Sequence, residues 1–211
     1  MNRTFIKDGM GKPPAVALVN PKYGHNVAGV LRACGAFGIN QMWVSGERAI
    51  SEWEARGRLP REERMKAYGD VEVCLGDYFF EAFKGKPLGN GKRCLQCGHH
   101  DHAGACELAV PVAVEVRRNA TPLTYFEHPQ NALYVFGPED GSLSTAQLAQ
   151  CHEFVIIPSD HCLNLATAVT TVLAHRRMTR QLAGLEDVRP SYETLVEQRG
   201  FYDCDDALTW R

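Results

Sequence analysis

The sequence has no long hydrophobic run and no large excess of charge of either sign. No stretch approaches the ~18 consecutive apolar residues of a membrane-spanning helix, and no apolar segment follows the charged N-terminus. We therefore expect a cytoplasmic protein without a membrane partner. The formal net charge of −2 provides no overall attraction to nucleic acid, so any RNA affinity must come from local groups of Lys and Arg.

The sequence also lacks internal repeats and the low hydrophobic content of disordered chains. Its 211 residues, 45% of them hydrophobic, can bury one sizeable core, and we expect a single domain over residues 1–211. Several of its eight cysteines lie in or beside apolar runs, where a free thiol behaves as a small buried hydrophobe. These are Cys34, Cys74, Cys151 and Cys162. A reducing compartment is a simpler interpretation than a disulfide framework.

Short apolar runs alternate with helical patterns along the chain. Runs of strand length occupy residues 15–19, 41–44, 71–75, 110–116, 132–136 and 154–157. Apolar residues at helical spacing follow the first run, from Val27 to Phe37, and the longest helical pattern covers residues 163–182. The alternation predicts an α/β fold with a mainly parallel sheet and helices on both faces.

Two segments interrupt this alternation. Residues 47–66 mix arginine with glutamate, which is typical of a surface helix or an ordered loop. Residues 84–107 are rich in Gly, Lys, His and Cys and have almost no apolar periodicity, which predicts an insertion.

The insertion brings three thiols and three imidazoles within thirteen residues. Cys94 and Cys97 form a C-x-x-C pair that suits tetrahedral zinc, and Cys106 with one histidine, such as His102, would complete a structural Cys₃His site. A second C-x-x-C pair is missing. The alternative is a His-rich loop with free thiols.

The first motif lies on the first predicted helix. Asn26, Gly29 and Arg32 are spaced to share roughly one helix face, so a small residue lies between two polar groups that can approach a ligand together. The alternative is that Asn26 caps the helix and Arg32 is an ordinary surface charge.

The second and third motifs follow buried strands. Residues 132–136 lead into a Gly-Pro turn that carries Glu139 and Asp140, and a plain turn does not explain the paired acids. Strand-end loops of this kind are where ligands bind in open α/β sheets. In the third motif Ile157 and a proline precede the segment Cys162-Leu163-Asn164 at a helix start, where Asn164 can act as a cap.

In this order the three motifs resemble the SpoU or TrmH branch of the SPOUT RNA methyltransferases. The resemblance covers residues 15 to 177 except the insertion. It implies a deep trefoil knot in the C-terminal half, one of the rare exceptions to unthreaded chains. It further implies a homodimer that uses S-adenosylmethionine to methylate a ribose 2′-hydroxyl in tRNA or rRNA.

The resemblance also implies roles for individual residues. The cofactor-binding positions that match are Glu115, Gly137, Ile157, Cys162 and Leu163. Arg32 matches the catalytic arginine, with Asn26 and Glu139 orienting it and Asn164 facing the substrate. Because a guanidinium stays protonated, we interpret Arg32 as a clamp on the neighbouring phosphate and a stabiliser of the developing alkoxide, and leave the proton acceptor open.

The third motif departs from the family pattern. Cys162 stands where the family usually has serine, and the loop between Pro158 and Cys162 is shorter than expected. Replacement of one small polar side chain by another is a simpler interpretation than a nucleophilic cysteine. Two other functions remain: a base methyltransferase of another SPOUT branch, and a non-catalytic RNA-binding or metal-responsive module that retains the fold.

Overall fold

The computed structural model of the chain describes residues 11–48, 51, 71–87, 105–107 and 109–186. The chain divides into two compact units, residues 1–174 and residues 175–211. No helix in these described ranges is long and apolar enough to cross a membrane.

The first unit is built on a seven-stranded sheet in the order β3-β2-β1-β8-β6-β9-β7. Its strands are β1 (Ala15–Val19), β2 (Gln41–Ser45), β3 (Glu72–Leu75), β6 (Val110–Val114), β7 (Thr121–Pro122), β8 (Ala132–Phe136) and β9 (Glu153–Ile156). Every pairing in this sheet is parallel. The carboxyl ends of all the strands therefore meet at one edge, where loops from distant parts of the sequence become neighbours.

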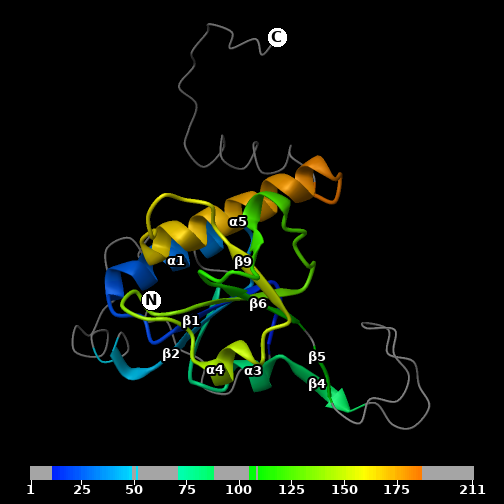
Figure 1. Cartoon of the computed structure of the whole chain (residues 1–211). Coiled ribbons are helices and arrows are strands. Elements are labelled where there is room, and N and C mark those ends of the chain that lie inside the picture. The colour runs from blue at the N-terminus through cyan, green and yellow to red at the C-terminus, as the bar shows by residue number, and fades with distance from the viewer. Residues whose placement is uncertain (1–10, 49–50, 52–70, 88–104, 108, 187–211) are drawn as a thin grey trace, which may run out of the picture. The chain divides into compact units, whose positions relative to one another are not determined.

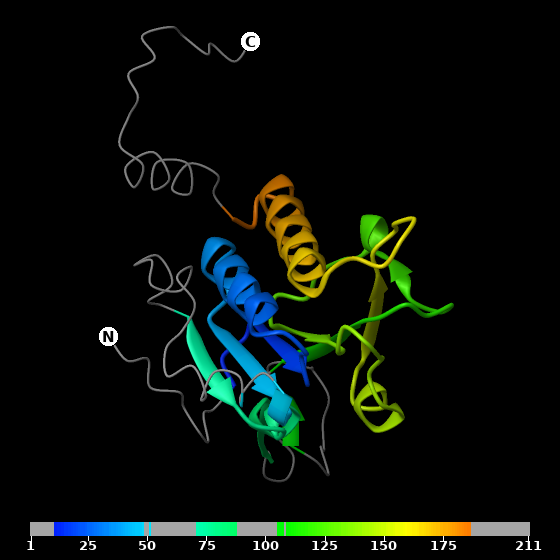
Figure 2. The same ribbon diagram turned by 90° about the vertical axis from the view of Figure 1, so that its left-hand side faces the viewer.

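Helices cover both faces of the sheet, as the sequence predicts. The helices are α1 (Gly24–Ala36), α3 (Phe79–Ala82), α4 (Thr145–Leu148) and α5 (Leu165–Leu182), with a 3-10 turn, η3 (Leu123–Tyr125). Figures 1 and 2 show α1 and α5 side by side over one face and the short helices α3 and α4 on the other.

Successive residues of each strand point to opposite faces, and the core divides accordingly. Val16 and Leu18 of β1 belong to the cluster that includes residues of α1 and α5, such as Val30 and Val169. Ala15 and Ala17 belong to a second cluster that contains the aromatic side chains of α3. Burial on both faces explains why these strands are continuous apolar runs rather than alternating ones.

The ends of the predicted insertion form a small separate sheet. Strands β4 (Lys84–Pro87) and β5 (Ala105–Glu107) pair in antiparallel fashion. Cys94, Cys97 and His102 lie outside the described residues, as do most of residues 47–66, and Cys106 lies in β5. Among the described residues, no group of three His, Cys, Asp or Glu side chains could hold a metal ion.

In the second unit, arginines of the last turns of α5 share one carboxylate. Glu186 lies 3.5 Å from Arg176 Nη1, 3.2 Å from Arg177 Nε and 2.6 Å from Arg180 Nε. Arg176 is only 4% exposed. These ion pairs lie at the C-terminal end of α5 and give the arginines a structural role. Positive charge at this end also interacts favourably with the helix dipole.

Candidate functional site

The three sequence motifs meet at the carboxyl edge of the sheet. The first motif follows β1, the second follows β8 and the third follows β9, and in the sheet these strands are separated only by β6. Parallel pairing thus brings together residues more than a hundred positions apart in the sequence.

Asn26 lies within α1, and the interpretation of Asn26 as the helix cap is wrong. Tyr23 is the N-cap residue, with no side-chain hydrogen bond to the helix, and the helix begins at Gly24. The Asn26 side chain is 3% exposed and donates through Nδ2 to Glu139 Oε1 at 2.6 Å. A buried amide needs such partners, so Asn26 fixes the first motif to the second.

Glu139 is held by donors on both of its carboxylate oxygens. Besides Asn26 on Oε1, the backbone N–H of Lys22 donates to Oε2 at 2.6 Å. Desolvation by partial burial raises the pKa of Glu139, but the hydrogen bonds from Asn26 and from the Lys22 and Tyr23 backbone together outweigh it, and the pKa lies below its ordinary value. The side chain is therefore an anion at neutral pH and a weak base.

Asn164 joins the third motif to the first. Its Nδ2 donates to Asn26 Oδ1 at 2.9 Å, while its Oδ1 accepts from the backbone N–H of Ala166 at 2.9 Å. The second contact confirms that Asn164 caps α5. One chain of hydrogen bonds, Glu139 to Asn26 to Asn164, thus connects all three motifs.

Gly29 marks the close approach of α1 and α5. A Cβ atom added at Gly29 would lie 2.9 Å from Ala166 Cβ, which is closer than two such atoms pack. The glycine therefore permits the helix separation at which Asn26 reaches Asn164.

Arg32 lies on α1 but apart from this hydrogen-bonded chain. Its side chain is exposed, and it forms no hydrogen bond or ion pair with another described residue. Six residues along an α-helix correspond to a rotation of about 120° from Asn26. The structure thus brings Asn26, Glu139 and Asn164 together and leaves the Arg32 guanidinium facing solvent.

The positions expected to bind a cofactor lie on the loops after β6, β8 and β9. Glu115 directly follows β6, and its Oε2 accepts from Leu143 N at 3.1 Å. A Cβ atom at Gly137 would lie 3.2 Å from the same Leu143 nitrogen. Glu115 and Gly137 therefore shape residues 137–143 into a loop that folds back on the end of β8.

The loop after β9 presents small and apolar groups to solvent. Ile157 is half-buried, Cys162 is exposed and Leu163 is 38% exposed. Ser159 Oγ donates to the His161 carbonyl at 2.9 Å and shapes the turn between them. Apolar side chains beside backbone groups outside the sheet suit an adenine ring and a methionine moiety, so the residues present fit S-adenosylmethionine.

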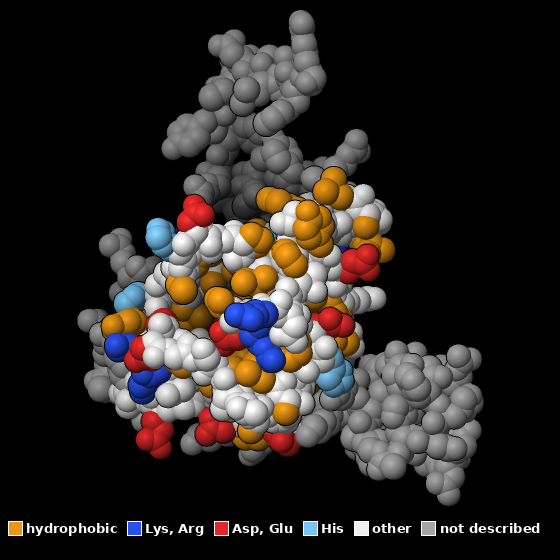
Figure 3. Space-filling view, in the orientation of Figure 1, with side chains coloured by type: hydrophobic (Ala, Val, Ile, Leu, Met, Phe, Trp, Pro, Cys, Tyr) orange, Lys and Arg blue, Asp and Glu red, His pale blue; other side chains and the backbone are white. Residues whose placement is uncertain are grey.

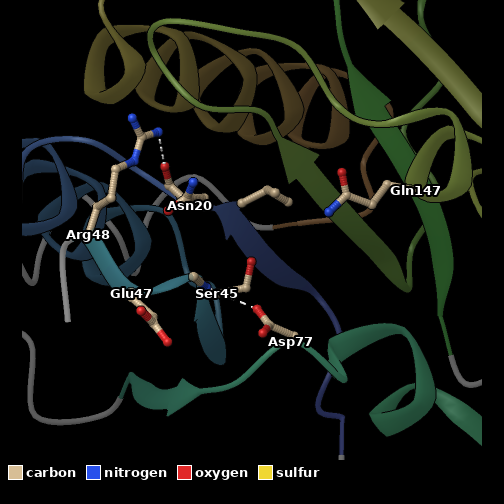
Figure 4. Close-up of a pocket in the computed structure, with 8 residues that line it drawn as sticks. Asn20, Ser45, Glu47, Arg48, Asp77 and Gln147 are labelled. Atoms are coloured by element: carbon tan, nitrogen blue, oxygen red, sulfur yellow. Dashed lines mark hydrogen bonds between the residues drawn. The ribbon is translucent and has the colours of Figure 1, made fainter. Parts of the chain in front are cut away.

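A second feature lies at the ends of β1, β2 and β3. A cavity of 420 Å³ lies there, bordered by Gln147 of α4, and Figure 4 shows the side chains that line it. Its polar lining residues are Asn20, Ser45, Glu47, Arg48, Asp77 and Gln147. Arg48 Nη1 donates to Asp140 Oδ1 and Oδ2 at 3.0 and 2.9 Å, and Nη2 donates to the Asn20 carbonyl. These bonds with Arg48 lower the pKa of Asp140.

Comparisons with known proteins agree with this architecture. No protein-family model matches the chain. The tRNA (cytidine-2′-O-)-methyltransferase TrmJ of Methanocaldococcus jannaschii is 28% identical over 166 residues, which are 75% of this chain and 65% of TrmJ. The chain thus spans just under two thirds of that relative's length.

Solved structures give the same result for the fold. A structure concerned with 2-OH methylation of C/U34 on tRNA matches 81% of this chain and 96% of its own, with TM-score 0.57 and 24% identity. The A. aeolicus TrmH/SpoU tRNA modifying enzyme matches 87% and 85%, with TM-score 0.59 and 15% identity. AviRb of Streptomyces viridochromogenes, in complex with AdoMet, matches 79% and 57%, with TM-score 0.54 and 20% identity. The chain therefore shares the fold of these SpoU-type proteins.

The SpoU-type fold accounts for the order of the motifs. One part of the site is not predicted by the sequence. Arg48 and Asp140 form a two-bond ion pair, and Lys22 Nζ lies 3.6 Å from the same carboxylate. Arg48 lies just beyond β2 at the same edge as the motifs. The position of Arg48 directly after a predicted parallel strand could have indicated a place at this edge. The charge pattern of residues 47–66 instead predicts a surface helix or an ordered loop.

Proposed function

We propose that the chain is an S-adenosylmethionine-dependent RNA methyltransferase that methylates a ribose 2′-hydroxyl in tRNA or rRNA. The observation that carries the proposal is the chain of hydrogen bonds from Glu139 through Asn26 to Asn164. It joins the three motifs by which the sequence resembles ribose methyltransferases. The names of the relatives, a cytidine-2′-O-methyltransferase acting on tRNA and an AdoMet-bound SpoU enzyme, support the same chemistry.

The cofactor fits the loops after β6, β8 and β9. When bound, S-adenosylmethionine supplies an electrophilic methyl group on a sulfonium. Glu115 and Gly137 would form one wall of its site through the loop that they shape. Ile157, Cys162 and Leu163 would form the other wall with backbone and apolar groups.

Glu139, Asn26 and Asn164 act in this proposal by positioning. Both oxygens of Glu139 are occupied by donors and its pKa is lowered by them, after opposing desolvation, so it is a poor acceptor for the 2′-hydroxyl proton. Its carboxylate instead fixes the Asn26 amide, which fixes Asn164 at the start of α5. The loop from β9 to α5 is thereby held against α1 while the ribose is aligned.

Arg32 acts on the RNA. Its guanidinium is exposed on α1 and makes no bond with another described residue, so it remains available to a phosphate. Its planar fork of N–H donors can form two parallel hydrogen bonds with a phosphate. In this role it clamps the neighbouring phosphate and stabilises negative charge on the attacking oxygen, while phosphate or water takes the proton.

A homodimer, the trefoil knot and a structural zinc in the insertion belong to the same proposal. Large apolar side chains are exposed on the last turns of α5, among them Met178 and Leu182, and a second copy of the chain would cover them. Figure 3 shows hydrophobic side chains gathered on this face and only small groups of Lys and Arg, several of them beside acids. RNA binding by two subunits would double the basic groups available to one RNA.

The test is transfer of label from S-adenosylmethionine to total RNA. After alkaline hydrolysis, label in alkali-resistant dinucleotides is expected, because a 2′-O-methyl group removes the hydroxyl that cleaves the adjacent phosphodiester. Label in mononucleotides would instead indicate base methylation. Absence of label, in a preparation that binds S-adenosylmethionine, would indicate a non-catalytic module.

A further inference from the structure

The cavity at the ends of β1, β2 and β3 lies outside the hydrogen-bonded chain of the three motifs. Its walls are fixed by bonds between the loops: Asn20 N donates to the Ser45 carbonyl at 2.8 Å, and Gly46 N donates to Asp77 Oδ1 at 2.9 Å. Gly46 has φ +80°, and a Cβ atom there would lie 2.5 Å from Asn20 Oδ1. Only glycine fits this close approach, so the backbone itself fixes the shape of the cavity.

The charge of the cavity excludes a phosphate as its occupant. Among the described residues that line it, Arg48 alone is cationic, and its guanidinium is engaged by Asp140 and by the Asn20 carbonyl. In Figure 4 the guanidinium points away from Asp77. The carboxylate of Asp77 is thus left to face a neutral or cationic group that donates hydrogen bonds.

The lining offers both an acceptor and a donor. Asp77 accepts from Gly46 N through Oδ1, and its Oδ2 forms no hydrogen bond with another described residue. Gln147 accepts from Ser144 N through Oε1, and Figure 4 shows the nitrogen of its amide on the cavity side. A cavity lined by both a carboxylate and a side-chain amide offers an acceptor for the amino group of a nucleobase and a donor for its ring nitrogen.

The cavity adjoins the proposed active site. Arg48 bonds both to the Asn20 backbone in the cavity and to Asp140, the neighbour of Glu139. The cavity volume of 420 Å³ lies within the range of roughly 300–1,000 Å³ usual for small-molecule sites. An unstacked base of an RNA bound with its ribose near Glu139 would therefore lie beside this cavity.

We propose that this cavity receives a nucleobase of the RNA that carries an exocyclic amino group, with Asp77 accepting from that amino group. The assignment rests on the proposed function, because it takes RNA as the molecule that passes the site. Cytosine, adenine and guanine carry such an amino group, whereas uracil presents a carbonyl oxygen where cytosine has its amino group. The cavity would thus contribute to the choice of RNA sequence.

The test is titration of the full-length, ¹⁵N-labelled chain with cytidine and with uridine. Cytidine is expected to shift the Gly46 backbone amide and the Gln147 side-chain amide, and to bind at least fivefold more tightly than uridine. In Asp77→Asn the side-chain oxygen still accepts from Gly46 N, but the second position becomes a donor. That variant should lose the preference for cytidine or reverse it in favour of uridine.

Glu127→Gln is the matched control, because Glu127 is an exposed carboxylate outside the cavity. It should leave both affinities unchanged. Equal shifts with both nucleosides, shifts away from Gly46 and Gln147, or an unchanged preference in Asp77→Asn would overturn the inference. Binding of spermidine with no response to either nucleoside would also overturn it, in favour of a cation site.

Methylation is measured separately in the same preparation. If RNA is methylated but the nucleosides do not perturb the cavity, this inference fails and the proposed function stands. If the nucleosides bind as expected but no RNA is methylated, the proposed catalysis fails and the base-binding cavity stands.

Discussion

The side-chain amide of Asn164 donates a hydrogen bond to Asn26 Oδ1 at 2.9 Å across a separation of 138 residues in the sequence. Each asparagine also has a second partner: Asn26 donates to Glu139, and Asn164 accepts from the first turn of α5. The geometry of α5, and of the loop before it, is therefore coupled to the loop after β8. Linked polar groups of this kind hold a single arrangement when all their members are satisfied.

Asn26→Ala should uncouple these loops. The substitution removes the donor to Glu139 and the acceptor for Asn164 at a buried position, so we expect a loss of about 1–3 kcal/mol in the free energy of unfolding. Methyl transfer should fall further than stability alone explains, because the cofactor loop is no longer held. Urea denaturation and single-turnover kinetics measure the two effects.

Asn119→Ala is the control for this variant, since Asn119 is an exposed asparagine in the same unit. It should change the free energy of unfolding by less than ~0.5 kcal/mol. Equal effects of the two substitutions would contradict the role given to Asn26.

Gly29→Ala should be destabilising although alanine favours helices. The new methyl group would lie 2.9 Å from Ala166 Cβ and push α1 away from α5, at a cost of about 1–3 kcal/mol that exceeds the gain of about 1 kcal/mol in helix propensity. The double variant Gly29→Ala with Ala166→Gly restores the space. Thermal unfolding of the two variants should show partial recovery in the double variant, and a stabilised Gly29→Ala would refute the close packing.

The sequence predicts the features that depend on local patterns of residues, and not those that depend on how distant elements pack. The strands β1 and β8 are predicted to the residue, because burial on both faces makes them continuous apolar runs with clear ends. The bond from Asn26 to Asn164 is not predictable in this way, since it depends on the separation of two helices. The pair of Arg48 with Asp140 is not predictable for the same reason. The spacing of Asn26 and Arg32 predicts one shared helix face, and this prediction is wrong because the two side chains diverge.

The lowered pKa of Glu139 predicts a dependence of stability on pH. Partial burial opposes ionisation, but the bonds from Asn26 and the Lys22 backbone favour the carboxylate, so the folded pKa lies below the ordinary value of 4.5. This contribution to stability is fully present above pH 4.5 and is lost as the pH falls through the folded pKa. Urea denaturation between pH 7 and pH 3 should show a weaker decline in Glu139→Gln than in the native chain, and identical declines would argue against the bonding pattern.

The cysteines and histidines of the insertion predict a metal content that is measured directly. If Cys94, Cys97, Cys106 and one histidine such as His102 bind zinc, the purified chain should contain one equivalent, and Cys97→Ser should lose it. Cys34→Ser is the control, because Cys34 is a buried core thiol. Less than a tenth of an equivalent of zinc in the native chain would remove the zinc site.

Arg32→Ala should strongly reduce methylation while leaving the fold unchanged. Because the guanidinium is exposed and unpaired within the described part of the chain, its loss should change the free energy of unfolding by less than ~0.5 kcal/mol. Loss of a group that stabilises charge in the transition state lowers kcat by roughly 10²–10³-fold. Arg32→Lys keeps the charge without the planar pair of donors and should recover only part of the activity.

Arg118→Ala, at another exposed arginine, is the control and should retain full activity. Native turnover by Arg32→Ala would exclude Arg32 from the reaction, whereas an equal loss in Arg118→Ala would mean that bulk positive charge, and not this position, is what the RNA requires.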